Sequence, residues 1–239
     1  MSRAFEEIDH RSTPLGDISL RRRLEPVLQV DVWEVKLGDE FLMSSLFTAS
    51  EEAVATLGLA ACAGDELDVV VGGLGLGHTA AAALADERVA RLQVIEALPE
   101  VIGWHRDGLV PLGAQLTGDE RCDLRHGDFF ALVDDGIEDD ARGDDRRFDA
   151  ILVDIDHTPS HHLGVGSAGF YGPAGFGRVC DQLQPGGVFA LWSDDPPDVG
   201  FEALVRDTFA SVDAHVVSFP NHYTGGESAC TVYVALAPG

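Results

Sequence analysis

The sequence predicts an α/β fold built on an open, mainly parallel sheet with helices on both faces. Three observations lead to this expectation. From Leu67 onward, apolar segments rich in Val, Ile and Leu alternate with helical segments, which is typical of parallel strands buried on both faces. The first of these segments, 67–71, leads into a glycine-rich turn at 72–77 and then into an alanine-rich helix at 79–84. Several segments also end in an acidic residue, so carboxylates should gather at one edge of the sheet.

The chain is expected to divide into residues 1–49, an N-terminal arm with a short β-hairpin, and residues 50–239, the sheet-and-helix domain. Residues 1 to about 20 show little hydrophobic periodicity and are expected to form a loose arm. Residues 27–43 alternate apolar and polar side chains around a Gly-Asp-Glu turn, which predicts the hairpin. The basic run Arg21–Arg23 is interpreted as a solvated face, with docking of a carboxylate or of a second subunit in a homodimer as the alternative.

The remaining elements are expected from their local patterns. Short β-branched runs between turn residues predict strands, and the periodic or alanine-rich segments between them predict helices. The expected strands are 67–71, 91–96, 123–126, 148–154, 188–192, 214–219 and 230–235, of which the last two form a hairpin at the sheet edge. The expected helices are 53–62, 79–84, 99–109, 171–183 and 199–209, and the charged stretch 134–147 is expected to be an exposed insertion.

The glycine turn narrows the kind of ligand that this sheet edge would bind. Glycine has no side chain and tolerates positive φ, so backbone N–H groups can approach a cofactor closely. The dinucleotide pattern G-x-G-x-x-G fails because His78 stands at its third glycine position, and the chain contains no nucleoside-triphosphate loop motif. Gly73, Gly75 and Gly77 instead follow the tighter spacing of S-adenosylmethionine-binding domains, with a turn that binds nothing as the alternative.

Acidic residues at the ends of three expected strands complete this candidate cofactor site. Glu96 lies 19 residues after Gly77, where a carboxylate can accept hydrogen bonds from ribose hydroxyls; its alternative role is at the N-terminus of the next helix. Gly127 and Asp128 precede two phenylalanines, a pattern suited to the amine and ring of adenine. Asp154 ends the fourth expected strand and should point into the same crevice. It is the candidate catalytic residue, with capping of the following loop as the alternative.

The segment 155–172 is expected to select the substrate, because it is long, rich in histidine and adjacent to the predicted crevice. Asp156, His157 and Tyr171 are the candidate substrate-binding residues. No metal site is predicted, because the neighbouring pair His161–His162 cannot easily point at one ion and a loop gives ligands no rigid frame.

Composition limits the function classes further. The 239 residues include 16 Lys and Arg against 41 Asp and Glu, and the net charge of −25 disfavours nucleic acid as a partner because it repels phosphate backbones. The same field would attract cations such as polyamines, although solvation is the simpler interpretation. The four cysteines lack C-x-x-C spacing and are expected to be reduced core thiols. Because no apolar run is long enough for a membrane span or a signal-peptide core, a cytoplasmic protein with no membrane partner is expected.

With these residues identified, the chain resembles the spermidine synthase family of aminopropyltransferases from about residue 20 to residue 236. Gly73–Thr79 is similar to the family's glycine motif G-G-G-D-G-G-T, and Gly127–Phe129 is similar to its G-D-A motif. Glu96 corresponds to the family's ribose-binding acid and Asp154 to its catalytic acid. Leu183–Gly187 is similar to the segment that precedes the family's fifth strand, here expected at 188–192. The resemblance implies the class I S-adenosylmethionine-dependent methyltransferase fold, a Rossmann-like seven-stranded sheet preceded by a short β region. It also implies decarboxylated S-adenosylmethionine as donor and a polyamine as acceptor.

The departures from the family's pattern lie in the polyamine half of the site. Leu76 stands where the family has the aspartate that holds the donor's amine, and Leu98 replaces a further acid. The family has a D-x-x-D-P segment at the place that begins with Asp154 here. In this chain the second acid of that segment, Asp156, comes one residue earlier than in the family. The tyrosine and histidine that the family has after the position of Glu52 are replaced by alanine and valine.

Three function classes therefore stay open. In an aminopropyltransferase, Asp154 would take a proton from the attacking amine of a small-molecule acceptor, and Asp156 would hold an ammonium group. A methyltransferase of a small molecule would use S-adenosylmethionine itself, with His157 or Asp154 as the base where one is needed. The third class is a nucleoside-binding protein without catalysis, because the fold alone cannot separate these activities.

Overall fold

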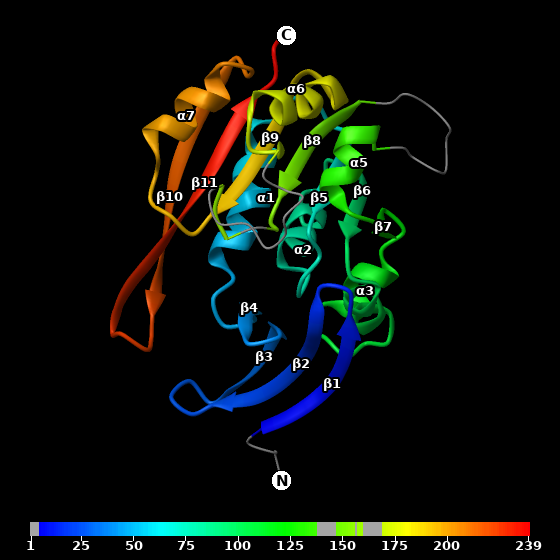
Figure 1. Cartoon of the computed structure of the whole chain (residues 1–239), viewed down its shortest axis with the longest axis vertical. Coiled ribbons are helices and arrows are strands. Elements are labelled where there is room, and N and C mark those ends of the chain that lie inside the picture. The colour runs from blue at the N-terminus through cyan, green and yellow to red at the C-terminus, as the bar shows by residue number, and fades with distance from the viewer. Residues whose placement is uncertain (1–4, 138–146, 156, 160–168) are drawn as a thin grey trace.

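Figure 1 shows the computed structural model of the chain, which describes residues 5–137, 147–155, 157–159 and 169–239. The described residues form an α/β part around a central sheet and a smaller antiparallel sheet at its lower end. The α/β fold expected from the sequence is confirmed.

A seven-stranded sheet forms the centre of the described structure, in the order β10-β11-β9-β8-β5-β6-β7. Its strands are β5 (Leu67–Gly72), β6 (Val89–Glu96), β7 (Cys122–His126), β8 (Phe148–Val153), β9 (Leu183–Ser193), β10 (Ser211–Asn221) and β11 (Gly226–Leu236). The five strands from β7 to β9 are parallel, whereas β11 and β10 are antiparallel to their neighbours and form the expected hairpin at the edge. The parallel strands end toward the smaller sheet, so side chains from several strand ends meet there (Figure 1).

Helices cover both faces of the central sheet, because successive residues of each strand point to opposite sides. In β5, Val69 and Val71 belong to the core cluster on one face and Val70 to the cluster on the other. The first face packs against α1 (Ala49–Ala61), α2 (His78–Leu84), α3 (Pro99–Arg106) and α4 (Gly113–Gly118), and the second against α5 (Phe129–Asp135), α6 (Pro173–Gln182) and α7 (Val199–Arg206). None of the described helices combines the length and the apolar character needed to cross a membrane.

The expectation of an exposed insertion over 134–147 is wrong at its start. Asp134 and Asp135 complete α5, a helix that the sequence analysis does not predict. Asp128 caps this helix and Val133 anchors it in the core, so a seven-residue helix is stable there despite its charged end. Residues 138–146 lie outside the described residues, and the rest of the expectation stays a prediction.

The N-terminal region forms a four-stranded antiparallel sheet within the described residues, in the order β1-β2-β3-β4. Its strands are β1 (Phe5–Thr13), β2 (Gly16–Glu25), β3 (Val30–Leu37) and β4 (Glu40–Ser44). The predicted hairpin corresponds to β3 and β4, whereas the expectation of a loose arm is wrong, because β1 and β2 occupy most of it. Ile18 and Leu20 are fully buried on the inner face of β2. The many charged residues around them pair across strands, and they obscure the alternation in the sequence.

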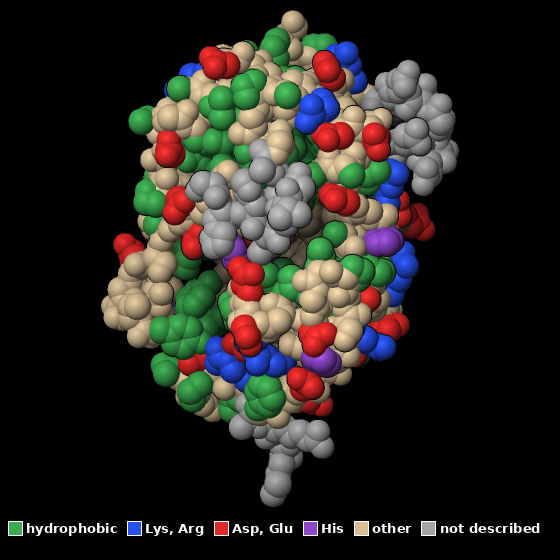
Figure 2. Space-filling view, in the orientation of Figure 1, with side chains coloured by type: hydrophobic (Ala, Val, Ile, Leu, Met, Phe, Trp, Pro, Cys, Tyr) green, Lys and Arg blue, Asp and Glu red, His purple; other side chains and the backbone are tan. Residues whose placement is uncertain are grey.

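The basic run Arg21–Arg23 lies in β2 and joins separate parts of the chain. Arg22 pairs with Glu6, and Arg23 pairs with Glu34, each at an N–O distance of 2.7 Å. The Arg23 guanidinium also donates to the hydroxyl of Tyr223, beyond the end of β10, at 2.7 Å. Figure 2 shows this gathering of Lys and Arg over the N-terminal sheet, beside exposed hydrophobic side chains. The ion pairs of this run therefore lie within the N-terminal sheet, and the hydrogen bond from Arg23 to Tyr223 connects that sheet to the β10–β11 hairpin.

We predict that Phe176→Ala destabilises the protein far more than Phe41→Ala. Phe176 is fully buried and contacts the rings of Phe189 and Phe209, so its truncation should lower the free energy of unfolding by about 3–5 kcal/mol. Phe41 is 47% exposed on β4, and its truncation should cost less than about 1 kcal/mol. Urea denaturation followed by circular dichroism measures both values, and equal losses would contradict this assignment of the core.

Candidate functional site

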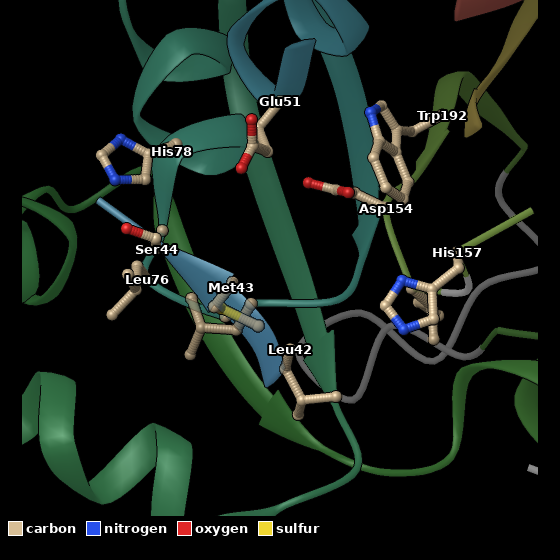
Figure 3. A pocket seen from close by; sticks show the side chains of 13 residues that line it. Leu42, Met43, Ser44, Glu51, Leu76, His78, Asp154, His157 and Trp192 are labelled. Carbon is tan, nitrogen blue, oxygen red and sulfur yellow. The ribbon is translucent and has the colours of Figure 1, made fainter. Parts of the chain in front are cut away.

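Two adjoining cavities lie at the carboxyl ends of the parallel strands, where the N-terminal sheet faces the central sheet. The outer cavity, of about 190 Å³, is lined by apolar side chains of the N-terminal sheet and of segments that follow the parallel strands, together with Gly73, Glu96, Asp128 and Phe130. The inner cavity, of about 90 Å³ and shown in Figure 3, is lined among others by Glu51, His78, Asp154, His157 and Trp192. The two cavities meet because both are lined by Leu42, Met43, Gly75, Asp154 and Ile155.

The glycine turn after β5 lines both cavities and has backbone angles that residues with side chains rarely adopt. Gly73, Gly75 and Gly77 have φ angles of +94°, +49° and +92°. A Cβ atom on Gly73 would lie 2.2 Å from the carbonyl oxygen of Asp154, so there is no room for a side chain there. Gly73 and Gly75 line the outer cavity, and Gly75 and Gly77 line the inner one. The structure thus brings the three predicted glycines to the cavities and presents their backbone there.

Glu96 ends β6 and is held by the backbone of two neighbouring turns. Its carboxylate accepts hydrogen bonds from the N–H groups of Leu98 at 2.9 Å and Leu74 at 3.0 Å. Burial raises the pKa of Glu96, and these N–H groups oppose the shift. Each carboxylate oxygen can accept more than one hydrogen bond, so the side chain keeps acceptor capacity toward the outer cavity.

Asp128 has a structural role as well as a place in the outer cavity. One oxygen of its carboxylate accepts from the N–H of Phe130 at 2.9 Å and so caps α5. The preceding Gly127 donates its N–H to the carbonyl oxygen of Glu96 at 3.0 Å, which ties the end of β7 to the end of β6. Asp128 and the ring of Phe130 consequently face the same cavity as Glu96.

Asp154 follows β8 and lies where the two cavities meet. Its carboxylate accepts a hydrogen bond of 2.6 Å from the hydroxyl of Thr79, in the first turn of α2. Its backbone N–H donates to the carbonyl oxygen of Gly72 at 2.9 Å, which fixes the residue against the glycine turn. Burial raises the pKa of Asp154, and the hydrogen bond from Thr79 opposes the shift.

Glu51 is a residue of the inner cavity that the sequence analysis missed. It lies in the first turn of α1, and its carboxylate and that of Asp154 point toward one another in Figure 3. Burial, together with the negative charge of Asp154, raises the pKa of Glu51 to about 8. In the sequence, Glu51 is recognisable only as an acid near a helix N-terminus. No sequence motif relates it to Asp154, which lies more than one hundred positions later.

The other walls of the inner cavity are aromatic, apolar or neutral. The indole N–H of Trp192 is buried without a hydrogen-bond partner among the described residues. Leu76 is buried at the cavity wall, and the ring of His157 lies 3.2 Å from a carboxylate oxygen of Glu40. His157 thus lines the inner cavity, and its role in binding a substrate stays a prediction.

Tyr171 lies outside these two cavities. Its ring packs edge-on against Phe170 at 5.1 Å, and it lines a separate hollow with Pro159 and Asp198. Asp156 and the pair His161–His162 lie outside the described residues, so their expected positions stay predictions. Among the residues that the structure describes, no cluster of three or more His, Cys, Asp or Glu could hold a metal ion.

The fold is similar to that of two solved spermidine synthases, although no family model matches the chain. One is a spermidine synthase in complex with the transition state analogue AdoDATO, with a TM-score of 0.74 and 17% identity over 96% of this chain and 73% of that one. The other is the spermidine synthase from Thermotoga maritima, with a TM-score of 0.72 and 17% identity over 96% of this chain and 72% of that one. These similarities establish the fold, that of spermidine synthases and class I methyltransferases.

We predict that Gly73→Ala and Gly75→Ala differ in their cost. At position 73 a methyl group adds a clash with backbone to an unfavourable φ, so the free energy of unfolding should fall by about 2–4 kcal/mol. At position 75 the methyl group meets only the side chain of Met43, which can move, so the loss should be about 1 kcal/mol. Chemical denaturation measures both variants, and a larger loss at position 75 would contradict the geometry of the turn.

Proposed function

We propose that the protein is a spermidine synthase-like transferase that uses a donor of the S-adenosylmethionine type. The observation that carries the proposal is the junction of the two cavities at Asp154. An apolar cavity with carboxylates at the strand ends opens there into a smaller cavity with buried acids. Such an arrangement suits a ligand with a nucleoside at one end and a positively charged reacting centre at the other.

The outer cavity is proposed to hold the nucleoside. Glu96 would accept hydrogen bonds from the ribose hydroxyls, and Asp128 would accept from the adenine amine beside the ring of Phe130. Gly73 and Gly75 allow the backbone to come close to the sugar. One similar structure contains the analogue AdoDATO, which supports an adenosyl compound as ligand.

The sulfonium centre would then lie near Asp154, at the entrance to the inner cavity. For aminopropyl transfer, an ammonium group of the acceptor loses a proton to Asp154. The amine nitrogen then forms a bond to the carbon beside sulfur, while the carbon–sulfur bond breaks and its electron pair stays on sulfur. The acceptor is proposed to be a small amine or polyamine, with Asp156 and His157 as candidate contacts.

The charged side chains of the cavities favour one of the two candidate donors, S-adenosylmethionine and its decarboxylated form. No Lys or Arg is among the described residues that line either cavity, so the carboxylate of S-adenosylmethionine would meet no cationic side chain. Glu51 and Asp154 would instead face an ammonium group, which favours decarboxylated S-adenosylmethionine. Leu76 would not contribute a charge to this binding.

A methyltransferase is the second candidate function. Leu76 favours it, because an apolar side chain lines the inner cavity at a place where the resemblance to spermidine synthases implies an amine-holding aspartate. In this case Asp154 or His157 would serve as the base for a small-molecule acceptor. Assays with amine acceptors and each of the two donors, followed by mass spectrometry of the donor and its thioadenosine product, distinguish the two reactions from a protein that only binds nucleosides.

We predict that Glu96→Ala weakens binding of adenosyl ligands about tenfold. The loss of hydrogen bonds to the ribose in a closed site should cost about 1–3 kcal/mol of binding free energy. Calorimetry with methylthioadenosine, S-adenosylmethionine and its decarboxylated form measures the effect. Glu87→Ala, on the exposed turn between α2 and β6, is the control and should bind like the unmodified protein. Equal affinity in Glu96→Ala, or no binding of any of the three compounds to the unmodified protein, would refute this assignment.

We predict that Asp154→Asn lowers turnover by about 10²–10⁴-fold while nucleoside affinity changes by no more than a few fold. The amide retains the size of the side chain and much of its hydrogen bonding, but it cannot take a proton from the acceptor. Single-turnover kinetics and calorimetry on the same preparation separate the two effects. If Asp154 only caps the following loop, activity should persist and the melting temperature should fall instead.

A further inference from the structure

The inner cavity holds two carboxylates and no cationic side chain to compensate them. Glu51 approaches from α1 and Asp154 from the end of β8, and both carboxylates point into the same space (Figure 3). No Lys or Arg is among the described residues that line the cavity. Burial lowers the pKa of His78, so this ring is neutral at neutral pH and leaves the acids uncompensated.

Two carboxylates in such a space cannot both be ionised at neutral pH, because the second charge must be formed beside the first in a medium that screens it poorly. The hydrogen bonds indicate which one is ionised. The hydroxyl of Thr79 donates to Asp154 at 2.6 Å, a length typical of a hydrogen bond to a charged oxygen. The hydroxyl of Ser50 donates to Glu51 at 3.0 Å, a longer contact that a protonated carboxyl group can also accept.

We propose that Glu51 is a second acid of the inner cavity, which keeps its proton beside the ionised Asp154 at neutral pH, so that the cavity offers one negative charge to a cationic group. The protonation of Glu51 is inferred from the geometry of the cavity alone. Its effect on the transfer reaction rests on the proposed function. The other groups around Glu51 do not supply a compensating charge. They are Glu52 on α1, Thr79 and His78 on α2, Trp192 on β9, Asp194 after it, and Cys230 on β11.

The electrostatics of these neighbours agree with the proposal. Burial and Asp154 raise the pKa of Glu51 to about 8, and burial raises the pKa of the Cys230 thiol to about 11, so both groups are mainly protonated at pH 7. The buried N–H of Trp192 can donate to a carboxylate or to a ligand but adds no charge.

In the proposed transfer reaction, the proton on Glu51 determines the net charge of the inner cavity in which the substrates bind. Asp154 carries the one negative charge, accepts the proton of the acceptor ammonium and later releases it to solvent, while Glu51 stays protonated. Above about pH 8 Glu51 would ionise as well, and the cavity would hold cations more tightly. The affinity for decarboxylated S-adenosylmethionine, relative to that for uncharged methylthioadenosine, should therefore rise between pH 7 and pH 9.

Carboxyl ¹³C NMR of protein labelled at glutamate tests the proton directly. We predict one glutamate resonance that titrates near pH 8, disappears in Glu51→Gln, and moves to a lower midpoint in Asp154→Asn because the neighbouring charge is gone. Glu52→Gln, at an exposed position of the same helix, is the matched control and should keep that resonance with only a slightly lower midpoint, because the charge of Glu52 contributes least to the raised pKa of Glu51. A resonance lost in Glu51→Gln that titrates near the ordinary glutamate value, or whose midpoint does not respond to Asp154→Asn, would overturn the inference.

A stability measurement keeps the inference testable if Asp154→Asn does not fold. Between the ordinary glutamate pKa and pH 8, the native state retains a proton that the unfolded chain has lost, so native stability falls as pH rises through this range. Glu51→Gln removes this contribution, and its melting temperature relative to the unmodified protein should rise by roughly 7 °C between pH 5 and pH 8. A difference that stays constant over this range would overturn the inference. Failure of every nucleoside to bind would overturn the proposed function but would leave the inferred protonation of Glu51 standing.

Discussion

The close approach of two backbone segments, at Gly73 and Asp154, is the constraint on which the candidate site depends. The Asp154 N–H donates to the carbonyl oxygen of Gly72, and the Gly73 N–H donates to that of Ile95, each at 2.9 Å, so the ends of β5, β6 and β8 are tied together. Because no side chain fits at position 73, this junction requires glycine. It brings Glu96 and Asp154, which are far apart in the sequence, to one crevice.

Burial then decides how these carboxylates behave. Most of the acids that give the chain its net charge of −25 can be hydrated at the surface, where water screens them. Glu51, Glu96 and Asp154 differ because the central sheet, α1 and the N-terminal sheet replace much of that water, and burial is the largest cause of each raised pKa. The N-terminal sheet is therefore part of the site, since Leu42 and Met43 line both cavities.

The sequence was sufficient for features that depend on local pattern and insufficient for those that depend on tertiary contact. The glycine turn, the strand ends and Asp154 follow from runs of neighbouring residues, and the structure places them as the pattern predicts. The strands β1 and β2 were missed because their charged residues, paired across strands, hide the alternation around Ile18 and Leu20. Glu51 was missed for a different reason: only the packing of α1 against α2, where the Thr79 hydroxyl lies 3.2 Å from the Glu51 carbonyl oxygen, brings it to Asp154.

The two cavities are formed by different kinds of sequence features. The outer cavity depends on a backbone turn, on strand ends and on two carboxylates, which a fold shared at 17% identity can retain. The charge of the inner cavity depends on single side chains such as Glu51 and Leu76, and one substitution there changes the number of charges that a substrate meets. The linings of the outer and inner cavities can therefore change independently of one another in this fold. In this protein, the proton that we infer on Glu51, beside the ionised Asp154, sets the charge of the inner cavity.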